Sequence, residues 1–200
     1  MKKTVRFVVI VTVLTLLAAG WTWRYVTMNQ YYDDLDNSDY MLYQAGERVP
    51  FEDDGNDMYT DLNGYYIRVD SYEVVDYNAY AAELGMSLPE EQLSPDKLAL
   101  VTITLSNESC EPNPVMLTDM MLHGVDTVIA MDWDVLVKAN SVLDGNTGIA
   151  LNPGTECELI LPYGLRKDQF DGFTWGKIDR YEVFLQVTST LTTKDIAVNG

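Results

Sequence analysis

The sequence is poor in the residues on which most metal-ion and nucleophilic catalysis depends. It has one histidine, His123, and two cysteines, Cys110 and Cys157, among 200 residues. A metal site built from several histidines is therefore excluded, and a nucleophile activated by an imidazole would have to use His123. Because His123 stands beside Gly124 between strand-like segments, we interpret it as structural. We predict no catalytic residue, no metal ligand and no cofactor, and therefore no enzyme.

Complete catalytic motifs and internal repeats are also lacking. Ser94-Pro95-Asp96-Lys97 has the spacing of the Ser-x-x-Lys element of penicillin-binding enzymes. A strand follows it directly, and neither Ser-Asp-Asn nor Lys-Thr-Gly occurs in the sequence. We interpret this match as chance. No repeat of fixed period is present, which argues against a solenoid or a propeller.

Basic residues are scarce after Arg24. Beyond that residue nine Lys or Arg stand against 31 Asp or Glu, which gives a net charge of −22. Phosphate backbones and anionic lipid head groups repel such a surface, so nucleic-acid binding is excluded. The acidity is typical of a solvated surface. The alternative interpretations are that it binds a cationic partner or divalent cations.

Acidic residues gather in two clusters, at positions 33–39 and 52–61. Counted from Asp34, the sixth position of an EF-hand loop is Asp39, where the turn needs glycine. The twelfth position is Ala45, where a glutamate would close the site. An EF-hand is therefore not predicted, and calcium binding of another kind is left open.

One long apolar run occurs, from Phe7 to Trp23, and Lys2, Lys3 and Arg6 precede it. Its 17 residues are at the short end of the roughly 17 to 25 that cross a bilayer. Basic residues stay on the cytoplasmic side of a spanning segment, so we expect the N-terminus inside and the remainder outside. The sequence thus predicts a single-pass protein of the cell membrane with an extracellular C-terminal domain.

The same segment could instead be a cleaved signal peptide, with Ala18-Ala19-Gly20 as the small residues that a peptidase reads. The aromatic and basic cluster that follows is typical of a membrane boundary and favours an uncleaved signal-anchor: Trp21, Trp23, Arg24 and Tyr25. No cysteine stands near the end of the run, which argues against a lipoprotein. We therefore predict a cytoplasmic tip and membrane anchor at 1–25, an acidic juxtamembrane spacer at 26–39 and one domain at 40–200.

The extracellular part has the alternation of β-strands. From Lys97 to Asn107, apolar residues occupy one side and threonines the other, which predicts a half-buried strand. Further strands are expected at 64–75 after an Asn63-Gly64 turn, at 115–130 in two pieces broken at His123-Gly124, and at 156–161, 181–187 and 195–199, with a short helix within 77–93. This pattern predicts a mainly β, antiparallel two-sheet sandwich with one or two short helices.

Three segments resemble a family of uncharacterised extracytoplasmic domains of Gram-positive bacteria: Gly46-Glu47-Arg48-Val49, the strand from Leu100 to Ser109, and Leu151-Asn152-Pro153-Gly154-Thr155 leading into the next strand. The resemblance extends over Tyr40 to Val198 in order. It implies an immunoglobulin-like fold and brings no catalytic residues. In these segments Asn107 can turn the chain, and Pro153-Gly154 suits a type II turn.

The sequence favours a non-enzymatic recognition or accessory module for an envelope protein or peptide. The alternative is an envelope sensor that binds a small ligand or a divalent cation through acidic loops. Trp133 and Trp175 could stack on carbohydrate, but we interpret them as core and rim residues. Cys110 and Cys157 would share the oxidising side of the membrane, so a disulfide is feasible, and we favour two free thiols.

Overall fold

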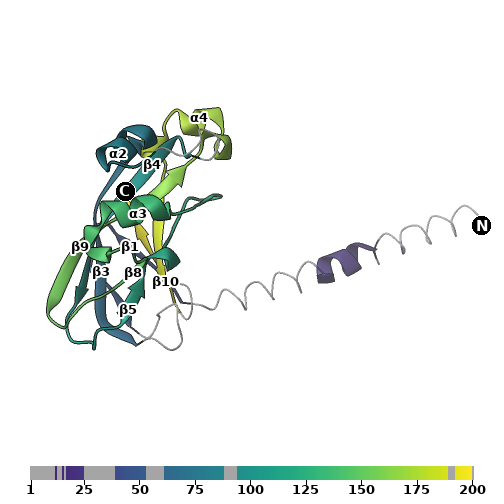
Figure 1. Ribbon diagram of the computed structural model, residues 1–200. Coiled ribbons are helices and arrows are strands. Elements are labelled where there is room, and N and C mark those ends of the chain that lie inside the picture. The colour runs from purple at the N-terminus through teal and green to yellow at the C-terminus, as the bar shows by residue number, and fades with distance from the viewer. Residues whose placement is uncertain are drawn as a thin grey trace, which may run out of the picture. The chain divides into compact units, whose positions relative to one another are not determined.

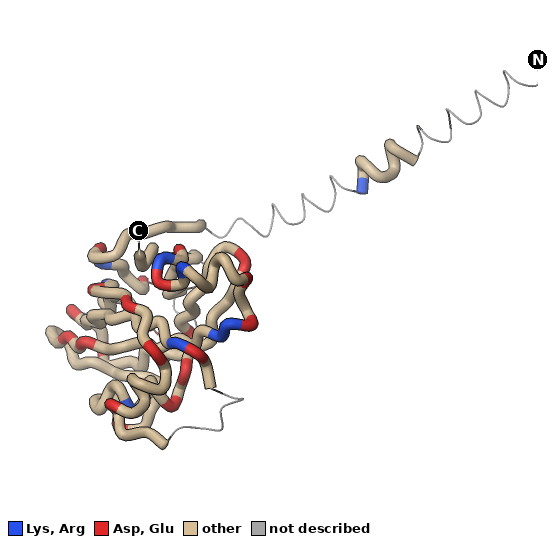
Figure 2. The backbone as a smooth tube through the Cα atoms, turned by 90° about the horizontal axis from the view of Figure 1, so that it is seen from above, with Lys and Arg blue, Asp and Glu red and all other residues tan. Residues whose placement is uncertain are grey.

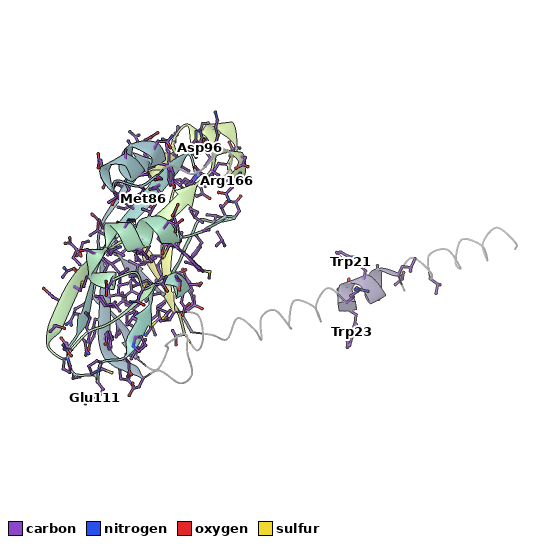
Figure 3. All side chains as sticks on the ribbon, in the orientation of Figure 1. Trp21, Trp23, Met86, Asp96, Glu111 and Arg166 are labelled. Atoms are coloured by element: carbon purple, nitrogen blue, oxygen red, sulfur yellow. The ribbon has the colours of Figure 1, made fainter. Side chains whose placement is uncertain are left out.

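The computed structural model describes residues 12, 15, 17–24, 39–52, 61–87, 94–188 and 192–199. The chain forms two units, Met1–Asp39 and Tyr40–Gly200. In the first unit residues 17–24 are helical, and Trp21 and Trp23 are exposed on this helix (Figure 3). Within the described part of the chain, no helix has the length and apolar character needed to cross a membrane. Most of the expected anchor, and the expected spacer up to residue 38, lie outside the described residues.

The second unit is mainly β (Figure 1). Its strands are β1 Asp39–Gln44, β2 Val49–Glu52, β3 Leu62–Asp76, β4 Lys97–Asn107, β5 Pro114–Met116, β6 Met121–His123, β7 Val128–Ile129, β8 Gly148–Ala150, β9 Thr155–Leu165, β10 Phe184–Thr188 and β11 Thr192–Ala197. Its helices are α2 Tyr77–Glu83, α3 Trp133–Ala139 and α4 Gly172–Trp175, with 3-10 turns at Leu117–Asp119, Ser141–Leu143, Lys167–Gln169 and Ile178–Arg180.

The strands form a five-stranded sheet in the order β1-β11-β10-β6-β7, a four-stranded sheet in the order β2-β3-β4-β9, and the pair β5-β8. Every pair whose register is described is antiparallel. Alternate side chains of both larger sheets enter one hydrophobic core, among them Val69, Ile103, Leu161, Leu185 and Ile196. The prediction of a mainly β, antiparallel fold with few helices is confirmed.

Lys194 of β11 links the two larger sheets. Its side chain is fully buried, and its ammonium group donates to the main-chain carbonyls of Pro50 (2.9 Å) and Phe51 (3.5 Å). The carboxylate of Glu52 lies 3.1 Å away and balances the charge. A cation this deep needs such partners, because burial without them costs several kcal/mol. The contact ties β11 to β2 of the other sheet.

The short helix expected within 77–93 is present as α2, Tyr77–Glu83. Two other sequence expectations need correction. β3 begins at Leu62, so Asn63-Gly64 is part of the strand and not a turn before it. α3 was not predicted, although its signal is local: the side chain of Asp132 accepts a hydrogen bond from Val135 N (3.0 Å) and caps the helix.

The outer face of β4, opposite the shared core, is covered along only half its length. Leu98 and Leu100 pack against Tyr77 and Ala81 of α2 and Val135 of α3. The rest of this face carries the hydroxyl residues Thr102, Thr104 and Ser106, and the helices do not reach it. Figure 3 shows Asp96, just before β4, at one end of the domain with Met86, and Glu111, after β4, at the opposite end. The uncovered half of the sheet is therefore the half toward Glu111.

Gly64 lies where β3 meets the turn after β4. Its φ is +100°, and a Cβ added there would lie 2.8 Å from Ser109 Oγ and 3.2 Å from Cys110 N. We expect Gly64→Ala to lower the free energy of unfolding by about 2 to 3 kcal/mol, since left-handed strain adds to the clash. Urea unfolding of the domain measures the loss.

Gly46→Ala is the matched control for this prediction. Gly46 also has positive φ (+86°), but an added Cβ would meet nothing within 4 Å. The control isolates the backbone strain, and we expect a loss of only about 1 kcal/mol. Equal losses for the two variants would show that the close approach of β3 to the turn does not require glycine.

Candidate functional site

The uncovered half of the four-stranded sheet carries a polar groove. The register aligns Arg68 with Thr104 and Glu158 across three strands, and Tyr66 with Ser106 and Glu156 in the next row. The residues of the two rows are two positions apart on each strand, so all their side chains project from the same face of the sheet. A groove of about 380 Å³ lies over this face, and its lining includes Arg48, Arg68, Thr104, Ser106, Glu108 and Glu156.

Arg48 is held flat against the sheet. Its guanidinium lies 4.1 Å from the centre of the Tyr66 ring. Nη1 forms an ion pair with Glu108 (2.7 Å), and Nη2 donates to Ser106 Oγ (3.3 Å). The cation–π contact and the carboxylate together fix a side chain that is otherwise half exposed.

Arg68 is fixed by a second set of contacts. It donates through Nε to Asp70 and through Nη2 to Thr104 Oγ1 (3.3 Å), and that hydroxyl donates in turn to Asp70. Hydrogen bonding to Asp70 and its charge raise the pKa of Arg68, and Glu156 adds a smaller effect in the same direction. Each arginine of the groove thus has its own carboxylate. Among the described residues, Glu156 and Glu158 form no ion pair.

β9 forms the edge of this sheet, and part of the edge is already occupied. The side-chain amide of Asn140 accepts from Ile160 N and donates to Ile160 O, both at 2.8 Å. Farther along, Asp132 N donates to Pro162 O (2.9 Å), and Gly164 N donates to the carbonyl of Ala130 (2.9 Å). The main-chain groups of these even-numbered residues therefore face away from β4.

Glu156 and Glu158 have the same parity, so their N–H and C=O groups also face outward. No described strand or loop pairs with them. The thiol of Cys157 makes a weak contact of 3.5 Å with Glu158 O. The sheet consequently has a short open edge directly beside the groove, and this edge can accept a further strand.

A buried asparagine fixes the end of the groove. Asn107 Nδ2 donates to the carbonyls of Cys110 and Leu151, and its Oδ1 accepts from Cys110 N, all at 2.8 Å. Gly154 N donates to Asn107 O (2.7 Å), and Gly154 has φ +77° in the turn whose Thr155 N bonds Asn152 O (3.2 Å). The predicted turns at Asn107 and at Pro153-Gly154 are confirmed.

Comparison with protein families matches residues 40–192 to a domain of unknown function, DUF5028. The chain belongs to this family. No curated protein and no solved structure matches it. The DUF5028 match spans β1 through β10 and includes both arginines of the groove and the open edge of β9.

His123 lies elsewhere in the DUF5028 domain, at the end of β6 in the five-stranded sheet. Its Nε2 is 3.0 Å from Asp195 Oδ2, and the hydroxyl of Tyr40 donates to the same oxygen (3.2 Å). Its ring stacks on Phe184, with 5.6 Å between ring centres. These contacts join β1, β6, β10 and β11, which agrees with a structural interpretation of the histidine.

The two tryptophans singled out by sequence differ in their surroundings. Trp133, the first residue of α3, is 61% exposed, so its interpretation as a core or rim residue was wrong. Trp175 is a rim residue as expected: it packs on Phe170 at 6.1 Å, and Lys97 Nζ lies 5.6 Å from its ring centre. The two were not predicted to share a site, and neither lines the groove.

Both cysteines are free thiols, as expected. Cys110 is buried, with its Sγ 3.2 Å from the carbonyl of Asp61, and burial raises the pKa of both thiols. The described residues hold no group of three or more His, Cys, Asp and Glu that could bind a metal ion. Most of the two acidic clusters, at 33–38 and 53–60, falls outside the described part.

Arg48, Arg68 and the edge of β9 were not predicted as a site. The sequence carries one signal for the groove, the polar alternation of Thr102, Thr104 and Ser106 on β4. That alternation marks a solvent-facing side but does not identify the strands beside it. The arginines and glutamates come from β3, β9 and the loops, and only the strand order brings them together.

Proposed function

We propose that this chain is a membrane-tethered, extracytoplasmic recognition or accessory module that binds an envelope protein or peptide and catalyses no reaction. The run from Phe7 to Trp23 anchors it in the cell membrane of a Gram-positive bacterium with the N-terminus inside. The basic residues before that run, and the acidity of the chain after it, support this orientation. The domain is an immunoglobulin-like sandwich, an assignment supported by two antiparallel sheets that share one core.

The open edge of β9 beside the groove carries this proposal. An extended peptide that adds to a sheet edge gains main-chain hydrogen bonds, and an adjoining groove supplies side-chain selectivity. The groove offers both guanidinium and hydroxyl groups, held in place by Asp70, Glu108 and the Tyr66 ring. Groups that are already positioned lose little side-chain entropy on binding, which favours recognition.

Site-directed photo-crosslinking in native membranes tests the proposal. A photoreactive side chain replaces exposed Thr155, which lines the groove, in the full-length chain. The control replaces Val142, which is 54% exposed in the 3-10 turn after α3. We expect one extracytoplasmic protein, identified by mass spectrometry, to be captured from Thr155 and not from Val142. Equal capture at both positions, or no capture from Thr155, would reject this surface as the recognition site.

A further inference from the structure

We infer that the open edge of β9 binds an extended cationic segment, with basic side chains at alternate positions opposite Glu156 and Glu158. This inference rests on the proposed function and specifies the chemistry of the partner. It follows from three features of the edge: the main-chain groups it leaves open, the charges beside them, and the points where its pairing ends.

The main chain sets the length of the bound segment. The outward N–H and C=O groups of Glu156 and Glu158 can form about four hydrogen bonds with an antiparallel strand. On one side Asn140 already occupies both main-chain groups of Ile160. On the other side the Asn152–Thr155 turn ends the strand, and Gly154 N bonds Asn107. Pairing is therefore confined to a segment of about three to five residues.

The charges select a cationic segment. Arg48 is neutralised by Glu108 and Arg68 by Asp70, whereas Glu156 and Glu158 have no ion-pair partner among the described residues. Side chains directly opposite in an antiparallel pair have their Cβ atoms about 4.5 to 5.5 Å apart, and opposite charges there are stabilising. Lysine or arginine at alternate positions of the added strand would meet the two carboxylates in turn.

The surrounding surface acts in the same direction. Acidic residues are distributed over the domain, with few basic residues between them (Figure 2). The net charge of −22 beyond Arg24 attracts a cationic segment from a distance and accelerates its association. The approach should weaken as salt shortens the range of this attraction.

The same two glutamates exclude a second copy of the chain as the occupant. Two β9 edges brought together would place Glu156 and Glu158 of one copy against the same residues of the other. Like charges directly opposite are destabilising, and charged side chains on edge strands are a common protection against self-pairing. The carboxylates thus keep the edge open for a partner of opposite charge.

The inference is tested by peptide binding to the full-length chain in detergent micelles. The probes are a peptide of alternating lysine and valine, a peptide of the same composition with its lysines contiguous, and an alternating glutamate–valine peptide. We expect the alternating lysine peptide alone to bind. Glu156→Gln together with Glu158→Gln should weaken this binding about tenfold, through the loss of two cross-strand charge pairs. Glu73→Gln with Glu83→Gln is the control, because it changes the net charge equally on exposed residues outside the groove, and it should leave binding unchanged.

Glu158→Pro tests the main-chain pairing itself. Proline removes an N–H that faces away from β4 and is tolerated on edge strands. Thermal unfolding checks that the variant is folded. We expect the folded variant not to bind the alternating lysine peptide. If this variant does not fold, the glutamine variants and the contiguous-lysine peptide decide alone.

Three results would overturn the inference: no binding of the alternating peptide, equal binding of the contiguous one, or binding unchanged in the Glu156→Gln, Glu158→Gln variant. The photo-crosslinking at Thr155 separates these results from a failure of the proposed function. If Thr155 still captures a partner in the Glu156→Gln, Glu158→Gln variant, the proposed recognition role stands. The inference that the partner is a cationic strand is then rejected.

Discussion

We expect Asn107→Ala to lower the free energy of unfolding by about 3 kcal/mol, because it removes the side-chain partner of Cys110 N and Cys110 O and leaves Leu151 O to the hydroxyl of Tyr65 at 3.0 Å. The Asn107 side chain is 1% exposed and bonds Cys110 N, Cys110 O and Leu151 O. Each unsatisfied buried group costs about 1 to 3 kcal/mol, and the carbonyls fall at the lower end because each keeps a second lone pair. Urea unfolding of the domain, followed by circular dichroism, measures the change.

Two variants control this prediction. Asn113→Ala also removes a hydrogen bond to a carbonyl, from Asn113 Nδ2 to Asp61 O at 2.8 Å. This bond is more accessible, so water can replace the side chain, and we expect a loss of about 1 kcal/mol. Asn107→Asp retains the acceptor for Cys110 N and brings negative charge against two carbonyl oxygens, so it should cost at least as much as the alanine variant. Similar losses at Asn107 and Asn113 would contradict the role of burial.

We expect the second large effect at alkaline pH, where the domain should lose about 2 kcal/mol through Tyr72 alone by pH 12. Burial, and then the charge of Asp179, raise the pKa of Tyr72 to about 12 from its ordinary value of 10.0. The fold therefore favours the neutral phenol. Its contribution is fully present below pH 10 and is lost as the pH rises toward 12. Burial raises the pKa of Tyr163 as well, and its hydroxyl donates to Met120 O (3.1 Å).

Unfolding free energies at pH 8, 10 and 12 measure this effect in the domain and in Tyr72→Phe. The phenylalanine variant cannot ionise at that position, so its stability should fall less steeply above pH 10. Tyr163→Phe removes the other buried phenol and should further reduce the fall of the unfolding free energy with rising pH. An alkaline slope unchanged by either substitution would show that these phenols do not ionise on unfolding.

The fold was predictable where one local pattern decides the structure. β4 has the predicted bounds because alternate positions from Ala99 to Leu105 are all apolar, and hydroxyl residues occupy the other side from Thr102 to Ser106. Leu98 and Leu100 lie on the same side of β4 as the hydroxyl residues, yet they are apolar. This indicates that another element covers them. The sequence does not show that α2 and α3 provide this cover. α3 depends on a single cap at Asp132, a signal easily outweighed by its strand-like neighbours.

The groove was not predictable because its residues meet only through register. Val69 pairs with Ile103 and Ser71 with Thr102, so one residue of β3 is unpaired between them. The unpaired residue reverses which positions of β3 face the core on one side of Asp70. The sequence gives no sign of this change. Likewise, the openness of β9 at Glu156 depends on which strands neighbour it, a property of strand order and not of composition.

The position of β11 has a consequence for the order of folding. This strand, at the C-terminal end of the domain sequence, lies between β1 and β10, and its Lys194 reaches the carbonyls of β2. The first and last strands are thus neighbours, and their sheet cannot close until residues 192–197 have been synthesised. Co-translational folding must leave the sheet incomplete until residues 192–197 have left the ribosome, and the long separation of the paired segments slows closure. A chain that stops before Thr192 would lack an interior strand, so closure of this sheet requires every strand of the domain.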